Sequence, residues 1–430
     1  MSVRDEPARD SRCRADFVLY GAGQLVTCDP ARSGLGVIEE GALAARGGRI
    51  VWVGPERELQ AEVELESGGR SLNAGGRVVM PGIVECHSHL VFGGSRAAEF
   101  QMRVAGRSYE EIAAAGGGIM STVAATRQAG DEELLAAARR HLDWMLSFGM
   151  TTVETKSGYG LTVKDELRIL RVVRELERET PVRLVSTFLG AHTVPAEYRE
   201  NPDAYVDLVV EEMLPRVADE GLARFCDVFC EIVAFDLSQS RKVLEAALDL
   251  GFKLKLHADQ LSAGGGAQLA ADLGAVSADH LDRIDGSGVE ALARAGITAV
   301  LLPGAVFFLG LKEYAPARRL REAGVEIALS TDFNPGTSYS ENPFLMGTIA
   351  SIYMGMSAEE VILGLTRRAA GALDLENEVG SLQSGLAADL VVLDTRDYLT
   401  LPYHFGVNPV AVVIKNGRIV KKGGEERAEL

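Results

Sequence analysis

The chain has 430 residues, of which 47% are hydrophobic and 24% charged, and its formal net charge is −17 at pH 7. This length accommodates one large and one smaller domain, and the charge argues against nucleic acid or a membrane surface as a partner, because both require basic patches. No apolar run approaches the roughly 20 residues that a membrane-spanning helix requires. The five cysteines are typical of reduced thiols rather than of a disulfide framework, so we predict a cytoplasmic protein.

Both ends of the chain have the pattern of short β-strands. Residues 1–14 are polar and predict a disordered tail. Strand-like runs such as Phe17–Tyr20 and Ile50–Gly54 follow within residues 15–80, and the same pattern returns within residues 382–425. Because these two segments flank a long middle part, we predict that they form one small β-sandwich domain together.

The middle of the chain, residues 81–381, alternates strand-like and helix-like segments. Eight short apolar runs end at or near His89, Glu154, His192, Glu231, His257, His280, Pro303 and Asp332. Eight strands that alternate with helices over about 250 residues predict an α/β fold of the (β/α)8 TIM barrel type. Gly116–Gly118 has neither the position nor the spacing of a nucleotide-binding fingerprint, which disfavours a doubly wound sheet.

Side chains that suit a hydrolytic metal ion stand where these runs end. Of seven histidines in the chain, five have this position: His87, His89, His192, His257 and His280. On a strand, His87 and His89 would point to the same face. Because the carboxyl ends of barrel strands converge, His257 could add a third nitrogen and Asp332 an oxygen. Such a set suits one divalent ion, Zn²⁺ or Fe²⁺, which lowers the pKa of bound water.

Other residues of ligand type are better explained by packing. Cys86 is expected to point to the opposite face of its strand, into the core. Cys226 and Cys230 share a strand but lack a second pair of ligands. We interpret His141, within a helix pattern, and His404, near the C-terminal strands, as structural or exposed.

Several longer phrases carry a family resemblance. They are Pro81–His89, Val91–Arg96, Thr155–Gly160, Leu189–Thr193, Ser277–His280 and Thr331–Gly336. In this order they resemble the imidazolonepropionase family of the amidohydrolase superfamily, from about Val79 to Pro343. The resemblance implies hydrolysis of the cyclic amide 4-imidazolone-5-propanoate to N-formimidoyl-L-glutamate, a step of histidine degradation. It also implies a homodimer.

The resemblance assigns roles to individual side chains. The metal ligands of the family match His87, His89, His257 and Asp332. Asp332 would also pass a proton from the metal-activated water to the ring nitrogen that leaves, and His280 would stabilise the oxyanion or hold the water. Positions that contact substrate in the family correspond to Arg96, Tyr159, His192, Asn334, Gly336 and Thr337. Of these, Arg96 would clamp the propanoate carboxylate with paired hydrogen bonds.

Position 260 departs from the family pattern. Some members have a glutamate there that contacts the imidazolone ring and has been proposed as a base, whereas this chain has Gln260. An amide can orient the ring but cannot remove a proton, so Asp332 or His280 would have to transfer it. Binuclear relatives carry a bridging lysine on the fourth strand. The corresponding run here, Phe229–Glu231, offers none, which favours a single metal ion.

Two alternatives stay open at this point. Another mononuclear amidohydrolase, such as an aminohydrolase of a nucleobase or cyclic amidine, would share the barrel and the ligands. Its neutral substrate would have no carboxylate for Arg96 to bind. A catalytically inactive scaffold of the same fold would be expected to have lost ligands, and this chain keeps all of them.

Overall fold

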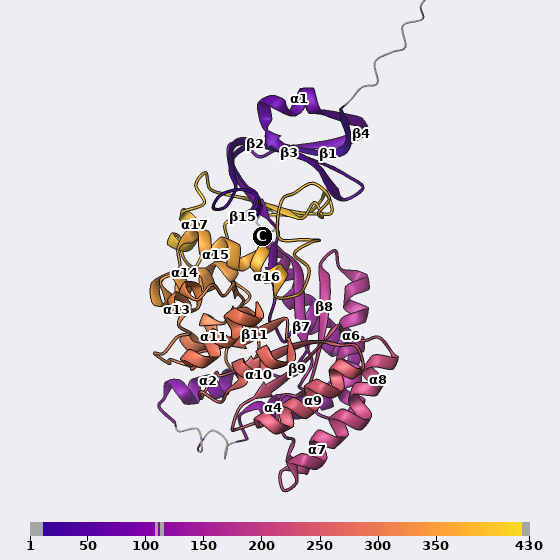
Figure 1. Ribbon diagram of the computed structural model, residues 1–430. Helices are drawn as coiled ribbons and strands as arrows, with labels where there is room; N and C mark the ends of the chain where they lie inside the picture. Colours follow the sequence, from indigo (N-terminus) through magenta and orange to yellow (C-terminus); the bar gives the residue numbers. More distant parts are fainter. Residues whose placement is uncertain (1–11, 108–110, 112–115, 424–430) are drawn as a thin grey trace, which may run out of the picture. The chain divides into compact units, whose positions relative to one another are not determined.

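The computed structural model describes residues 12–107, 111 and 116–423 (Figure 1). The chain divides into two compact units. Unit 1 contains the described residues up to Pro81, Ser381–Tyr398, and the described residues from Val410 onward. Unit 2 contains Gly82–Gly380 and Leu399–Pro409. Within the described ranges, no helix combines the length and the apolar character needed to cross a membrane.

Unit 1 contains a mixed sheet of strands from both ends of the chain. Its strands are β1 (Cys13–Val26), β2 (Val37–Arg46), β3 (Arg49–Pro55), β4 (Val63–Asn73), β5 (Val78–Pro81), β14 (Leu390–Leu393), β15 (Val410–Lys415) and β16 (Arg418–Lys422). The order is β16-β15-β14-β5-β1-β2-β3, and β4 pairs with β1. Leu19, Leu43, Ile50 and Leu390 meet in its core. A sheet of chain-end strands was predicted, and its arrangement as a two-layer sandwich stays a prediction.

The first strand begins earlier than the sequence indicated. β1 starts at Cys13, inside the segment for which a disordered tail was predicted. Cys13–Ala15 pairs in parallel with Val63–Leu65, and such a distant partner leaves no signal in the local pattern. Residues 1–11 of the predicted tail, and residues 424–425 of the predicted β domain, lie outside the described residues.

Unit 2 is built on eight parallel strands that neighbour one another in chain order, here called the parallel sheet. They are β6 (Ile83–Glu85), β7 (Met150–Lys156), β8 (Arg183–Ala191), β9 (Phe225–Cys230), β10 (Lys253–Ala258), β11 (Ser277–His280), β12 (Thr298–Leu301) and β13 (Ile327–Leu329). All eight correspond to the apolar runs of the sequence. The strands are buried on both faces, as is typical of parallel sheets covered by helices.

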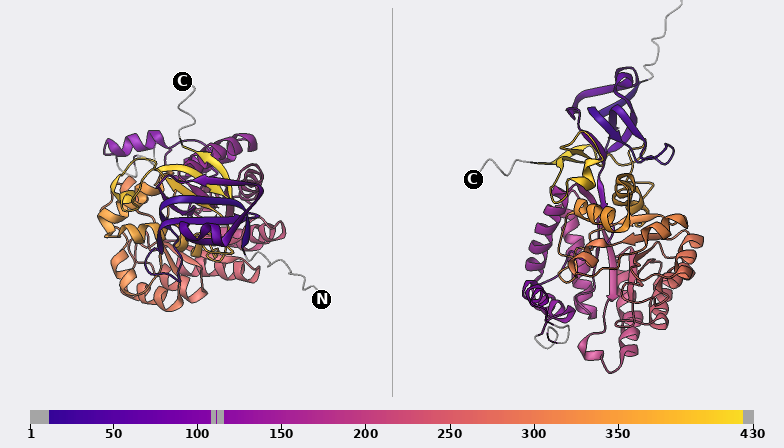
Figure 2. Two further views of the ribbon diagram at one scale, coloured as in Figure 1. Left: turned by 90° about the horizontal axis from the view of Figure 1, so that it is seen from above. Right: turned by 90° about the vertical axis from the view of Figure 1, so that its left-hand side faces the viewer.

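Helices of unit 2 lie along the outside of the parallel sheet (Figure 1 and Figure 2). Within the described residues, the helices of unit 2 are α2 (Ala97–Val104), α4 (Ile119–Gln128), α5 (Asp131–Ser147), α6 (Val163–Glu179), α7 (Pro202–Leu208), α8 (Leu214–Asp219), α9 (Leu237–Asp249), α10 (Gly266–Leu273), α11 (Gly286–Ala295), α12 (Pro303–Phe308), α13 (Ala317–Glu322), α14 (Pro343–Met354), α15 (Ala358–Leu365), α16 (Arg367–Gly371) and α17 (Thr400–Tyr403). Unit 1 adds α1 (Leu59–Glu62) and the 3₁₀ turn η1 (Glu56–Glu58). Unit 2 adds the 3₁₀ turn η2 (Ala196–Tyr198) and the π-helical segment η3 (Val209–Met213) between α7 and α8. In α5, Leu134, Leu142 and Met145 form the buried face.

The last strand of the parallel sheet returns to the first. Beyond the strand ends, Ser88 forms a parallel bridge with Phe333, whose carbonyl accepts the N–H of His89 at 2.8 Å. The buried carboxylate of Glu85 accepts the N–H of Thr331 at 3.1 Å and contacts the hydroxyl of Ser330. These contacts join the residues after β6 to those after β13, so the curled parallel sheet is consistent with the predicted (β/α)8 barrel.

Candidate metal centre

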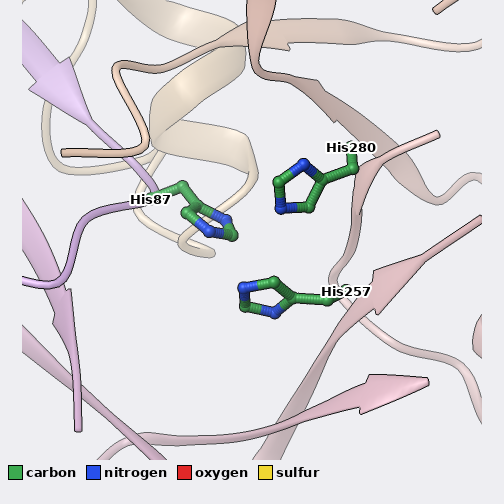
Figure 3. Close-up of side chains that lie close together, drawn as sticks. All are labelled: His87, His257 and His280. Carbon is green, nitrogen blue, oxygen red and sulfur yellow. The ribbon is translucent and has the colours of Figure 1, made fainter. Parts of the chain in front are cut away.

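Three histidines that follow or end strands of the parallel sheet face one another. Figure 3 shows the rings of His87, His257 and His280 pointing toward a common space. The ring centroid of His87 lies 4.5 Å from that of His257 and 5.4 Å from that of His280. All three side chains are buried, and one nitrogen of each lies within 4.8 Å of the others. This spacing allows them to share one ion.

A second group of donors consists of His87, His89 and Asp332. Asp332 Oδ1 lies 3.6 Å from His87 Nε2 and 3.8 Å from His89 Nε2. These distances are too long for hydrogen bonds. Two donors that each lie about 2.1 Å from a tetrahedral ion are about 3.4 Å apart, so the spacing fits shared ligation. His87 Nε2 has no hydrogen-bond partner among the described residues although it is buried.

Two aspartates contact the Nδ1 atoms of two of these histidines. Asp279 Oδ2 lies 2.6 Å from His87 Nδ1, and Asp227 Oδ2 lies 2.9 Å from His257 Nδ1. Such carboxylates fix the ring orientation and leave Nε2 for a metal, as is typical of metal-binding histidines. Neither aspartate was predicted from the sequence. The sequence does contain a signal that could have identified them: a single charged residue inside a short apolar strand, as Asp227 is within Phe225–Cys230.

Lys156 lies among the carboxylates beneath the histidines. Its Nζ is 2.8 Å from Glu154 Oε1, 2.8 Å from Asp227 Oδ2 and 3.5 Å from Asp279 Oδ2. Burial alone would lower the pKa of Lys156, but Asp227 and Glu154 raise it above its usual range. Burial would likewise raise the pKa of Asp227, but His257 and Lys156 hold it well below the usual range. Lys156 and Asp227 therefore form a buried ion pair.

Burial sets the protonation states of the candidate ligands themselves. It lowers the pKa of His87, His89 and His280 well below the usual range, so these imidazoles are neutral at pH 7. Neutral imidazole is the form that binds metal ions. Burial also raises the pKa of the Asp332 carboxyl well above its usual range, and a bound cation opposes this effect.

Tyr159 and His192 lie beside His89. The ring of His192 stacks on that of His89 at a centroid distance of 5.2 Å, and Tyr159 lies 5.7 Å from His89. His192 Nδ1 is 3.0 Å from the carbonyl oxygen of Gly158, which fixes the ring. Burial, with His257 second, lowers the pKa of His192 to about 3. The structure thus brings two predicted substrate contacts next to a candidate ligand.

The guanidinium of Arg96 is already paired on one edge. Its Nε and Nη2 donate to the Glu99 carboxylate at 2.9 Å and 2.5 Å, and the same carboxylate accepts the N–H of Gly118 at 2.7 Å. The Nη1 atom lies against Gly336, where a Cβ atom would overlap it. Arg96 also lines a cavity of about 230 Å³. Glu99, which was not predicted from the sequence, therefore occupies the Nε/Nη2 edge of the guanidinium. Only the edge that carries Nη1 is left for the carboxylate that Arg96 was predicted to bind.

Asn334 shapes the loop that follows β13. Its Oδ1 accepts the N–H groups of Gly336 and Thr337 at 2.8 Å and 2.7 Å, and its Nδ2 donates to the Asp332 carbonyl at 2.6 Å. Thr337 Oγ1 lies 3.5 Å from Asp332 Oδ2. The predicted ligand Asp332 and the predicted substrate contacts Asn334, Gly336 and Thr337 thus lie together in this loop. The side chain of Asn334, however, forms its hydrogen bonds within the loop itself. Such Asx turns are a common use of asparagine.

Gln260 lies half-buried on the loop after β10. Two carboxylates hold this loop. Asp259 accepts the N–H groups of four successive residues, Gly264–Ala267, and Glu231 accepts that of Leu261 at 2.8 Å. The anchored loop fixes the backbone on both sides of Gln260.

One placement in the sequence analysis was wrong. β6 ends at Glu85, so His87 and His89 lie beyond the strand rather than on it. The reason is that the Glu85 carboxylate accepts the N–H of His87 at 3.1 Å and turns the chain out of the ladder. The loop nevertheless directs both rings to the same side, where Asp332 lies.

The residues interpreted as packing side chains are mostly buried. Cys86, Cys226 and Cys230 are buried free thiols. His141 is buried, with its Nδ1 2.7 Å from Glu341 Oε1, whereas His404 is exposed. These positions agree with the structural roles expected for them.

Comparisons with known proteins agree with this site. The model of the amidohydrolase family matches residues 110–421. The imidazolonepropionase of Symbiobacterium thermophilum is 49% identical over 96% of this chain and 99% of its own length. That of Shouchella clausii is 48% identical over 91% of this chain and 88% of its own.

A solved structure shows the same fold at low identity. An adenosine deaminase from Xanthomonas campestris with bound zinc superposes with a TM-score of 0.70 at 20% identity, covering 95% of this chain and 93% of its own. At this identity the likeness supports the fold alone. The identities of the relatives and their coverage confirm the resemblance carried by the sequence phrases: the chain belongs to the imidazolonepropionase family of the amidohydrolases.

Proposed function

We propose that the protein hydrolyses 4-imidazolone-5-propanoate to N-formimidoyl-L-glutamate in histidine degradation, with one divalent metal ion. Full-length similarity to imidazolonepropionases supports the reaction. The observation that carries the metal site is the placement of Asp332 Oδ1 between two histidine nitrogens, 3.6 Å and 3.8 Å away.

His87, His89, His257 and Asp332 would hold the ion. Three neutral imidazoles and one carboxylate suit Zn²⁺ and Fe²⁺ alike. When bound, either ion would supply hydroxide at neutral pH by lowering the pKa of water. The buried, unpaired Nε2 of His87 fits this assignment, because an unsatisfied buried nitrogen is otherwise costly.

Three side chains would then act on the substrate. Asp332 would accept a proton from the attacking water and deliver it to the ring nitrogen that leaves. His280 would donate a hydrogen bond to the oxygen on which negative charge develops, since a neutral imidazole still carries one N–H. Gln260 would orient the ring by hydrogen bonding without moving a proton.

Two groups of side chains would bind the substrate, one at its ring and one at its carboxylate. Tyr159 and His192 would flank the imidazolone ring beside His89. The Nη1 edge of Arg96 would bind the propanoate carboxylate, because Glu99 occupies the other edge. Gly336 would leave room for that edge, and Thr337 would line the site next to Asp332.

The test is an assay of metal-replete protein with freshly prepared 4-imidazolone-5-propanoate, following the loss of its ultraviolet absorbance. We expect turnover, and a fall in kcat/KM of about 10–100-fold in Arg96→Ala, the size of a lost hydrogen bond between charged groups (about 1.5–3 kcal/mol). Arg139→Ala is the matched control, because Arg139 pairs with Glu179 at the surface. Metal-loaded protein without turnover would contradict the proposal.

A second candidate is an aminohydrolase that acts on a neutral ring. The observation in its favour is the pairing of Arg96 with Glu99, which already neutralises the charge of the guanidinium and occupies its Nε/Nη2 edge. Turnover of a cyclic amidine, with kinetics unchanged in Arg96→Ala, would select this alternative. The homodimer and the cytoplasmic location stay predictions of the sequence.

A further inference from the structure

Two fully buried lysines lie near the candidate metal centre, and the mechanism above uses neither. Lys255 Nζ donates to Ser277 Oγ at 2.7 Å and to the Ala372 carbonyl at 3.1 Å, and it lies 3.8 Å from Asp279. Lys156, in contrast, contacts carboxylates on three sides. Among the ion pairs of the described residues, only those of Lys156 reach both Asp227 and Asp279.

These two aspartates connect Lys156 to two candidate ligands. Asp227 approaches Nδ1 of His257 at 2.9 Å, and Asp279 approaches Nδ1 of His87 at 2.6 Å. In each aspartate, the oxygen near the histidine is Oδ2, the same atom that faces Lys156 Nζ. One ammonium group therefore contacts both of the oxygens that orient the rings.

A third contact reaches the loop that carries His87 and His89. Glu154, 2.8 Å from Lys156 Nζ, accepts the N–H of Ser88 at 3.3 Å. The Glu154 backbone carbonyl accepts the Ser88 hydroxyl at 2.6 Å. Ser88 lies between the two histidines in the chain, so this contact supports both of their backbone positions.

We infer that Lys156 is a positioning residue for the metal centre, whose ammonium group holds Asp227 and Asp279 so that His257 and His87 present Nε2 to one ion. This inference rests on the proposed metal site. Without the shared cation, two buried carboxylates would repel each other at close range. Their rotamers would then no longer be fixed at the positions that orient the rings.

The first experiment measures Zn²⁺ affinity of Lys156→Met by competition with a chromophoric chelator. Removal of a positive charge near the site would by itself strengthen cation binding. We expect the opposite, a loss of about 10–100-fold, the usual effect of disturbing groups that orient metal ligands. The visible spectrum of the Co²⁺-loaded variant should change as well, because it reports ligand geometry. An unchanged or increased Zn²⁺ affinity would overturn the inference.

Lys255→Met is the matched control. It removes an equally buried lysine from the same interior. Among the ion pairs of the described residues, Lys255 reaches Asp279 at 3.8 Å but not Asp227. We expect a smaller loss of Zn²⁺ affinity than in Lys156→Met. Equal losses in the two variants would show a general effect of burial and charge, and would contradict a positioning role.

The double variant Lys156→Met/Asp227→Asn tests the route of the effect. It removes one charge of each sign, which spares the fold an unpaired buried charge. If Lys156 acts through Asp227, the lysine substitution costs less affinity in the Asp227→Asn background than in the native chain. The same loss in both backgrounds would exclude this route. Should Lys156→Met not fold, the double variant is compared with Asp227→Asn alone. We then expect a further, smaller loss of Zn²⁺ affinity, because Lys156 still contacts Asp279 in that background, and an unchanged or increased affinity would overturn the inference.

Ligand variants separate this inference from the metal site on which it rests. If His257→Ala and Asp332→Asn leave Zn²⁺ affinity intact, the proposed site is wrong and the role of Lys156 falls with it. If they weaken binding while Lys156→Met does not, the site stands and only the positioning role is excluded.

Discussion

Gly336 occupies a position where a single methyl group would reach the edge of Arg96 that we propose binds the substrate. A Cβ atom there would overlap Nη1 of Arg96. We expect Gly336→Ala to displace the guanidinium and to lower kcat/KM about 10–100-fold, mainly through KM, since small misplacements of binding groups have effects of this size. Steady-state kinetics with 4-imidazolone-5-propanoate measure the effect.

The control for this substitution is Gly371→Ala. An added Cβ at Gly371 meets no atom within 4 Å, so kinetics and thermal stability should stay close to those of the native chain. If Gly336→Ala also leaves KM unchanged, Arg96 is not the anchor of the substrate.

For individual residues, the sequence indicated candidate ligands but not the residues that contact them. The histidines at strand ends were recognisable because imidazole is rare in this chain and its positions recur with the apolar runs. Asp227, Asp279 and Lys156 were not, because their contacts depend on the register between strands β7, β9, β10 and β11, which no local pattern records. Glu99 was not predicted either, although it lies in the first turn of α2, three residues after the N-cap residue Arg96.

At the scale of elements, the buried Glu166 at the start of α6 organises the loop after β7. Its carboxylate accepts the N–H groups of Gly158, Gly160 and Leu161 at 2.9 Å, 2.7 Å and 2.8 Å. These residues flank Tyr159. In Glu166→Gln, one oxygen is replaced by an NH₂ group, so at least one donor loses its acceptor. We expect a loss of about 1–3 kcal/mol in the free energy of unfolding, together with a higher KM, measured by urea denaturation and kinetics.

Glu177→Gln provides the comparison on the same helix. Glu177 is exposed, and substitutions of this kind change stability by less than about 0.5 kcal/mol. Equal stability of the Glu166 and Glu177 variants would mean that the loop does not depend on the carboxylate.

Elements were predictable where their signals are local. The helix α5, for example, begins with three acidic residues in its first turn and ends shortly before Gly149, and both signals are local in the sequence. The short strands β6 and β13 were less well placed, because Glu85 and Ser330 end their ladders through side-chain contacts across the sheet. The pairing of β1 with β4 could not be predicted either, because the two strands are about 50 residues apart in the chain and local patterns do not record such partners.

At the scale of the whole molecule, metal binding and folding should be coupled. The candidate ligands come from segments that are far apart in the chain, so the site exists only in the folded protein. An ion at a thousandfold excess over its Kd would stabilise the native state by about 4 kcal/mol. We expect a chelator to lower Tm, and Zn²⁺ or Fe²⁺ to restore it, as followed by calorimetry.

The variant Asp332→Asn is the control for this experiment. Its Tm should respond much less to the chelator, because it lacks the carboxylate that faces His87 and His89. The same response in both proteins would indicate that the stabilising ion binds elsewhere.

The sheet of unit 1 has a consequence for the synthesis of the protein. β5 pairs with β1 on one edge and with β14 on the other, and all of Gly82–Gly380 is translated between β5 and β14. At about 5–20 residues per second, that interval lasts tens of seconds. Throughout it, the nascent chain presents an unpaired β5 edge of the kind that invites mispairing. Unit 1 can therefore complete its fold only after the ribosome has synthesised β14, β15 and β16, the last strands of the chain.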